Sequence, residues 1–224
     1  MAAIHNIIAK AINILIPIQC MGCGKKDEQL CRSCLDRLFE IHEWCMVCNT
    51  FTLEGLCKKC QKRVGLEQVS WVSAYADQLT RSIIEYLKYK GASQLAFPLA
   101  RMMARAGKGT LDKNTVLLAV PLHKRRERVR GFNQAELLAA AIAKELSMSL
   151  MKRGVLVRVR NDPPQAKTKS REERKENIKG AFAVTDNTAL VGKNILLVDD
   201  VATTGATLFE IARIAKEAGA NKIS

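Results

Sequence analysis

The chain has 224 residues, of which 48% are hydrophobic, and this length supports one main core with a small appended module. Its formal net charge of +14 favours anionic partners such as phosphates, nucleic acid or acidic lipid. No apolar run reaches the roughly 18 residues that a membrane span needs. The N-terminus also has no convincing cleavage site for a signal peptide. We therefore expect a soluble cytoplasmic protein with no membrane span.

The first 19 residues predict an amphipathic helix that ends near Pro17. Ile4, Ile8 and Leu15 fall on one face of this helix, whereas Lys10 falls on the other. The apolar face can dock on the protein's own core, which is the commoner use of such a helix. It can also bind a partner or a membrane surface.

All eight cysteines lie between Cys20 and Cys60, and they form four pairs with two residues between the members of each pair. The pairs are Cys20 with Cys23, Cys31 with Cys34, Cys45 with Cys48, and Cys57 with Cys60. This spacing suits tetrahedral zinc, because each pair wraps around one edge of the metal. An all-cysteine site leaves no open coordination position, so the zinc is predicted to be structural. A disulfide framework is disfavoured in a cytoplasmic chain.

The residue after each pair indicates how the pairs combine. Gly24 follows the first pair and Asn49 follows the third, and both residue types tolerate the positive φ that metal-binding knuckle turns often use. This alternation favours two sites in sequence, one from the first four cysteines and one from the last four. A crossed arrangement, with pairs one and three together and pairs two and four together, also fits the spacing. Residues 20–62 are predicted to be a double zinc ribbon with two zinc ions.

The middle of the chain alternates strand and helix patterns. We expect a strand at 69–75, a helix from 79 to 87, a helix at 94–106 and a buried strand at 116–120. A basic turn follows at 121–134, with five Lys or Arg and one Glu between His123 and Arg130, and then a helix to Leu146. A further strand at 155–157 precedes a polar loop at 161–180. Loops after parallel strands hold ligand contacts in α/β sheets, so the basic turn is a candidate anion site.

One ordered stretch carries the strongest functional signal. A buried strand at 195–198 is followed by Asp199 and Asp200, then by a small hydroxyl-rich loop and a helix that ends at Gly219. The loop residues are Val201, Ala202, Thr203, Thr204, Gly205, Ala206 and Thr207. A helix N-terminus with nearby hydroxyl donors can hold a phosphate, and the two carboxylates can accept from a vicinal diol. The stretch therefore predicts a site for a ribose 5-phosphate.

This stretch resembles the phosphoribosyl pyrophosphate (PRPP) motif of type I phosphoribosyltransferases, and other phrases are similar to the ComF (competence protein F) family. These phrases are the eight-cysteine ribbon, Leu87–Gly91, the hallmark-like Arg130–Gln134, and Gln165, Arg171 and Asn177 with Gly180–Phe182. The resemblance covers the whole chain. It implies an α/β fold at 63–224, with a mainly parallel sheet flanked by helices, preceded by the small zinc-ribbon domain.

The resemblance also implies roles for single residues. Asp199 and Asp200 would hold the ribose hydroxyls, the loop at 201–207 would wrap the 5-phosphate, and Mg²⁺ would accompany PRPP. Lys124, Arg125 and Arg130 are candidates for the pyrophosphate. Lys167 and Arg171 are catalytic candidates, with Lys169 and Arg174 in the same loop, because family members have a mobile loop there that closes over the substrate.

Two functions follow from the resemblance. The first is phosphoribosyl transfer with release of pyrophosphate. The second is a non-catalytic competence factor that binds single-stranded DNA, uses the PRPP pocket as a sensor and works with a DNA-translocating helicase. The charge fits both, although only Phe132 supplies an aromatic ring between His123 and Gly180. The sequence ends at Ser224, where family members usually continue through a strand, so we expect a short edge strand or an incomplete record.

Overall fold

The computed structural model describes residues 18–38, 43–89, 92–107, 112, 114–161 and 176–224. The expected N-terminal helix lies outside these residues except for its last two positions, and so does most of the polar loop. The elements are α2 (Arg32–Leu38), α3 (Lys58–Val64), α4 (Gln78–Tyr89), α5 (Ala92–Gly107), β1 (Thr115–Ala119), α6 (Lys124–Arg130), α7 (Gln134–Leu146), β2 (Ser149–Leu150), β3 (Leu156–Arg158), β4 (Phe182–Val184), β5 (Asn194–Val198), α9 (Ala206–Glu217) and β6 (Lys222–Ile223). None of the described helices is long and apolar enough to cross a lipid bilayer.

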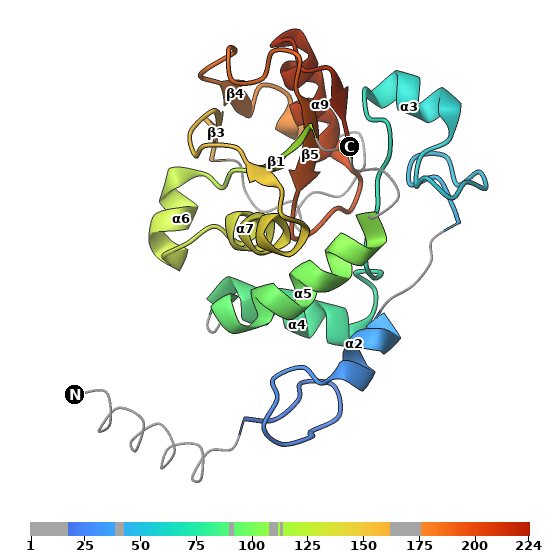
Figure 1. The fold of residues 1–224 in the computed structure, drawn as a ribbon, viewed down its shortest axis with the longest axis vertical. Helices are drawn as coiled ribbons and strands as arrows, with labels where there is room; N and C mark the ends of the chain where they lie inside the picture. Colours follow the sequence, from blue (N-terminus) through green and yellow to red (C-terminus); the bar gives the residue numbers. More distant parts are fainter. Residues whose placement is uncertain (1–17, 39–42, 90–91, 108–111, 113, 162–175) are drawn as a thin grey trace.

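A parallel sheet with the strand order β2-β1-β5-β6 forms the centre of the molecule (Figure 1). The pairing of β1 with β5 runs from Thr115 opposite Asn194 to Ala119 opposite Val198. The carboxyl ends of these two strands therefore lie side by side, and the chain segments that follow them start from the same edge of the sheet. A second, antiparallel pair joins β3 to β4.

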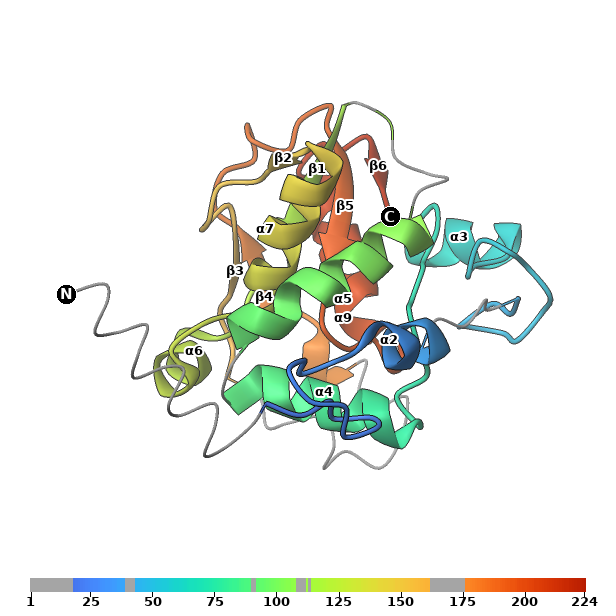
Figure 2. The same ribbon diagram turned by 60° about the horizontal axis from the view of Figure 1, so that its bottom comes forward.

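Helices cover both faces of this sheet (Figure 2). On one face, α5 and α7 pack on β1 and β5 through Leu117 and Val198, with small residues such as Ala100 and Ala139 where the two helices meet. On the other face, α9 buries its apolar stripe in the cluster that contains Ile195. The architecture confirms the predicted α/β class with a mainly parallel sheet.

Each cysteine group shares an apolar core with the larger domain. The first group packs with Leu38 of α2 against Ile83 and Leu87 of α4. Cys45 and Cys60 of the second group join Leu56 and Ile223 in the cluster that also contains residues of α9. Burial of ribbon residues against the main domain ties the stability of the two parts together.

Two predicted elements are wrong. Residues 69–75 form no ladder with any described strand, although they are rich in strand formers. A cleft of about 400 Å³ separates this segment from β5, and strand propensity without a neighbouring strand forms no sheet. The basic turn is also not a simple loop, because α6 occupies 124–130. His123 caps its N-terminus, Gly131 ends it at a φ of 85°, and none of its residues is buried.

Candidate functional site

Asp199 and Asp200 lie at the carboxyl end of β5, as the sequence predicts. Oδ1 of Asp199 accepts a hydrogen bond from the backbone N–H of Asp200 at 2.8 Å. Desolvation of the half-buried Asp199 carboxyl, together with the neighbouring charge of Asp200, raises its pKa well above the usual aspartate range. Raised carboxylate pKa values are common where a protein holds two acids for a ligand rather than for its own stability.

The turn after the acidic pair leads directly into α9. Ala202 and Thr203 are exposed, so the turn opens to solvent rather than into the interior. Gly205 is the N-cap residue at a φ of 73°, and its position has no side chain that could cap the helix. The first turn of α9 also carries no acidic residue, and Thr204 Oγ1 accepts from Ala206 N–H only at 3.5 Å. The positive end of a 12-residue helix is therefore available to an anion.

Phe209 packs against Gly205 in this turn, a contact that no sequence pattern predicted. Its backbone N–H donates to the carbonyl of Gly205 at 2.9 Å, and its ring packs against the Gly205 α-carbon. A methyl group at position 205 would lie 2.4 Å from Cζ of Phe209. The turn therefore needs glycine for two reasons, the positive φ and the contact with the ring.

We expect Gly205→Ala to weaken phosphate binding strongly, because the turn must move away from Phe209 as well as adopt a strained φ. Gly192→Ala is the matched control, since Gly192 has a φ of 68° and open space around its α-carbon. The control should lose about 1–2 kcal/mol of stability and keep its ligand affinity. Thermal unfolding and titration with PRPP measure both effects. Equal ligand affinity in the two variants would contradict the role given to Gly205.

Ionised Asp199 is expected to reduce stability at neutral pH. The folded state binds the proton of this carboxyl more tightly than the unfolded state does, so its contribution to stability is greatest below the usual aspartate pKa. That contribution is lost as the pH rises through the raised pKa. Asp199→Asn should therefore stabilise the protein at pH 7 by about 0.5–2 kcal/mol, with no gain near pH 3. Denaturant unfolding at both pH values tests this, and a loss of stability at pH 7 would contradict it.

The basic turn starts at the same sheet edge as the acidic pair. The N–H of Val120 donates to the carbonyl of Val198 at 2.9 Å, so the ends of β1 and β5 are in contact. Lys124 and Arg125 follow on the exposed first turn of α6, and Arg130 is half-buried at its end. His123 is a capping residue, since its Nδ1 accepts from the N–H of Arg125 at 3.2 Å. The other two candidates, Lys167 and Arg171, lie outside the described residues.

Asn133, within the Arg130–Gln134 motif, has a structural role. Its Nδ2 donates to the carbonyl of Val120 at 3.0 Å, and its Oδ1 accepts from the N–H of Ala135 at 3.1 Å. The side chain thus caps α7 and fixes the end of the basic turn to the end of β1. Asparagine before a helical pattern is an N-cap signal, so the capping role was readable from the sequence, whereas the bond to Val120 was not.

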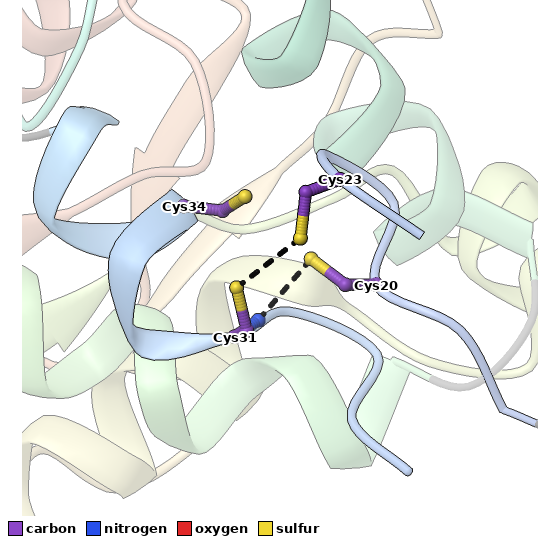
Figure 3. A group of neighbouring side chains, drawn as sticks. All are labelled: Cys20, Cys23, Cys31 and Cys34. Atoms are coloured by element: carbon purple, nitrogen blue, oxygen red, sulfur yellow. Dashed lines mark hydrogen bonds between the residues drawn. The ribbon is translucent and has the colours of Figure 1, made fainter. Parts of the chain in front are cut away.

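The first cysteine group joins a turn to the start of α2 (Figure 3). Its four sulfur atoms, from Cys20, Cys23, Cys31 and Cys34, lie within 4.8 Å of one another. The Cys23–Cys31 sulfur distance is 3.6 Å, close to the edge of about 3.8 Å that a tetrahedron with Zn–S bonds of about 2.3 Å requires. This geometry fits a metal ion with four thiolate ligands.

The pKa values of two thiols in the first cysteine group also agree with metal binding. Burial alone would raise the pKa of Cys20, but backbone N–H groups, including that of Cys31 at 3.3 Å, outweigh burial and lower it to about 6. Burial raises the pKa of Cys34 to about 12. A bound metal ion would displace the proton of such a buried thiol to solvent and stabilise the thiolate.

The second group, Cys45, Cys48, Cys57 and Cys60, has the same arrangement, with all sulfurs within 4.8 Å. The Cys48–Cys57 sulfur distance is 3.6 Å. Gly24 and Asn49 adopt φ values of 74° and 57°, as the knuckle pattern predicts. The structure thus groups the cysteines in sequence rather than in the crossed arrangement, and each group could hold one zinc ion.

The cleft borders the acidic pair and the beginning of the turn. Its walls are mainly apolar, and they come from 68–75, α4, α5, α7 and the last residues of β5. Asp199, Asp200 and Thr203 are among its lining residues. Space for a second molecular group therefore exists beside the acidic pair.

A parallel sheet with an acidic pair and an uncapped helix after its central strand defines a phosphoribosyltransferase-like domain, and the phosphoribosyl transferase domain family matches residues 133–224. The chain is 32% identical over 206 residues to competence protein ComFC of Bacillus subtilis, covering 87% of this chain and 81% of that protein. It is 34% identical over 171 residues to the DNA utilization protein YhgH of Salmonella typhimurium, covering 73% of each. Competence protein F of Haemophilus influenzae is 29% identical over 213 residues, covering 91% of this chain and 86% of that protein. The chain belongs to the ComF family.

Among solved structures, the glutamine PRPP amidotransferase from B. subtilis, complexed with ADP and GMP, matches with a TM-score of 0.40. The sequence identity is 18%, and the match covers 59% of this chain and 26% of the amidotransferase chain.

Proposed function

We propose that the chain binds PRPP at the turn between β5 and α9 and transfers its phosphoribosyl group to an acceptor with release of pyrophosphate. The observation that carries this proposal is the turn directly after the acidic pair, which is exposed at Ala202 and Thr203 and leads into the N-terminus of α9, where no side chain caps the helix. A 5-phosphate fits the amides of this turn, and the ribose hydroxyls fit the carboxylates. PRPP is the ligand class that has both groups on one sugar.

The reaction needs binding and charge stabilisation rather than a nucleophile from the chain. Asp199 and Asp200 hold the ribose, so that C1 faces the acceptor. Lys124 and Arg125 supply positive charge for the departing pyrophosphate, because they follow β1 at the same sheet edge. Oxygen ligands such as these carboxylates and the phosphates of PRPP suit Mg²⁺, which would neutralise charge on the leaving group.

A pyrophosphate-release assay with PRPP, Mg²⁺ and a panel of nucleobases and amines tests the catalytic half of this proposal. Transfer should give pyrophosphate only with particular acceptors, and Asp199→Asn/Asp200→Asn should remove the signal. PRPP binding without release for any acceptor would instead favour a sensor that has lost catalysis.

The second candidate function is a competence factor that binds single-stranded DNA in the cytoplasm and works with a DNA-translocating helicase. One observation favours it: α6 holds five Lys or Arg in seven residues, and none of its side chains is buried. A solvated basic helix suits phosphate contacts. The names of the relatives, competence protein and DNA utilization protein, support the same function. An affinity for a labelled single strand that does not change with salt would argue against these contacts.

A further inference from the structure

The second zinc ribbon carries an exposed aromatic pair that the proposed PRPP site does not use. Trp44 and Phe51 are opposite each other in a β-bridge, and their side chains are 58% and 61% exposed. We propose that this pair, with the basic residues of α3, is a stacking platform for the bases of single-stranded nucleic acid. The inference rests on the DNA-binding role proposed above and places it at a defined surface.

The hairpin geometry holds the two rings together on one face. The N–H of Cys45 donates to Thr50 and the N–H of Thr52 donates to Glu43, which makes Trp44 and Phe51 a non-hydrogen-bonded pair with close side chains. The ring centroids are 6.3 Å apart at an interplanar angle of 90°. An edge-to-face pair of this exposure leaves ring surface free for a third planar group.

The cysteine side chains occupy the face of the hairpin opposite the two aromatic rings. Cys45 follows Trp44 directly and is fully buried, so its side chain points to the cluster while Trp44 points to solvent. The apolar surface of the rings is therefore not needed to build the ribbon core. Because the cysteine cluster fixes the backbone on both sides of the bridge, the rings would lose little freedom on binding.

The net charge of residues 43–64, the segment that carries the pair, favours an anionic partner over a protein surface. Residues 43–64 contain four Lys or Arg and two Glu, and one of the Glu residues, Glu54, is paired with Lys58 at 3.0 Å. Lys59, Lys62 and Arg63 are exposed on α3. Aromatic rings interleaved with cations are the usual composition of sequence-tolerant single-strand sites. Figure 2 shows α3 on the side of the sheet opposite α6, so this surface is separate from the basic turn.

The test compares the parent protein with Trp44→Ala/Phe51→Ala in binding to a fluorescein-labelled 15-nucleotide dT strand, followed by anisotropy at constant salt. Base stacking on aromatic side chains predicts a loss of affinity of about 5- to 150-fold. Phe97→Ala is the matched control, because Phe97 is 45% exposed on α5 and is not part of the 43–64 segment that carries the pair, so its removal should leave DNA affinity unchanged. Zinc content and melting temperature should be unchanged in both variants.

A second probe separates stacking from charge. A strand of the same length made of abasic sites keeps the phosphates and lacks the bases, so the parent should bind dT more tightly and the double variant should bind both equally. Equal binding of the two strands by the parent, unchanged affinity in the double variant, or no binding by the parent would each overturn the platform. A change from dimer to monomer in the double variant, with unchanged DNA affinity, would instead identify the rings as an interface between copies. The variant should keep its PRPP affinity, and Asp199→Asn/Asp200→Asn should keep its DNA affinity, so failure of one proposal is distinguishable from failure of the other.

Discussion

Asp199→Asn/Asp200→Asn should lower the affinity for PRPP by 100-fold or more while leaving the fold intact. Both substitutions keep the size of the side chain and remove the charge that accepts from the ribose hydroxyls. Hydrogen bonds to charged groups contribute about 1.5–3 kcal/mol each, so the loss of two charged acceptors corresponds to about 3–6 kcal/mol. Isothermal titration with PRPP and Mg²⁺ measures the effect directly.

The matched control for this pair is Asp186→Asn. Asp186 is an exposed aspartate that accepts from the N–H and hydroxyl of Thr188, and it is not in the turn or the acidic pair. The Asp186→Asn substitution removes one negative charge and leaves the residues of the proposed site unchanged. A similar loss of PRPP affinity in Asp186→Asn would mean that net charge, rather than specific hydrogen bonds to the ribose hydroxyls, governs binding.

Loss of zinc should destabilise the whole protein rather than the ribbons alone. Cys34 and Cys60 are 1% and 2% exposed, and each belongs to an apolar cluster that includes residues of the larger domain. Structural zinc in small modules contributes about 10–16 kcal/mol of apparent binding energy, which is comparable to the stability of an entire domain. We expect Cys34→Ser and Cys60→Ser each to lower the melting temperature by more than about 10 °C.

The zinc content of the parent and of the same variants gives the number of zinc ions per chain. The parent should hold two zinc ions per chain, each serine variant should hold one, and Ser33→Ala, on the exposed side of α2, should hold two. A parent chain with no zinc, or serine variants that keep both ions, would contradict the two-site assignment.

The sequence alone predicted the parts of the fold that depend on residues close together in the chain. The β5 strand, its acidic end, the turn and α9 follow one another without a break, and local rules for buried strands and helix termini are sufficient there. The cysteine grouping was favoured for the same reason, because Gly24 and Asn49 mark the two knuckles locally.

The parts that the sequence missed depend on distant neighbours. Residues 69–75 have strand propensity, yet they pair with no described strand, because the cleft lies between them and β5. The α6 helix has no apolar period, so its existence depends on the His123 cap and the Gly131 end rather than on a buried face. The contact of Phe209 with Gly205 depends on a ring orientation that no spacing rule supplies. The roles of Lys167 and Arg171 stay predictions.

The most direct measurement is a calorimetric titration of the zinc-loaded parent protein with PRPP and Mg²⁺, with ribose 5-phosphate and inorganic pyrophosphate as separate partial ligands. A site built from the amides of the β5–α9 turn and the acidic pair predicts saturable binding of one PRPP per chain and weaker binding of ribose 5-phosphate at the same site. Absence of binding by PRPP and by ribose 5-phosphate would contradict the claim that this turn holds a phosphorylated sugar.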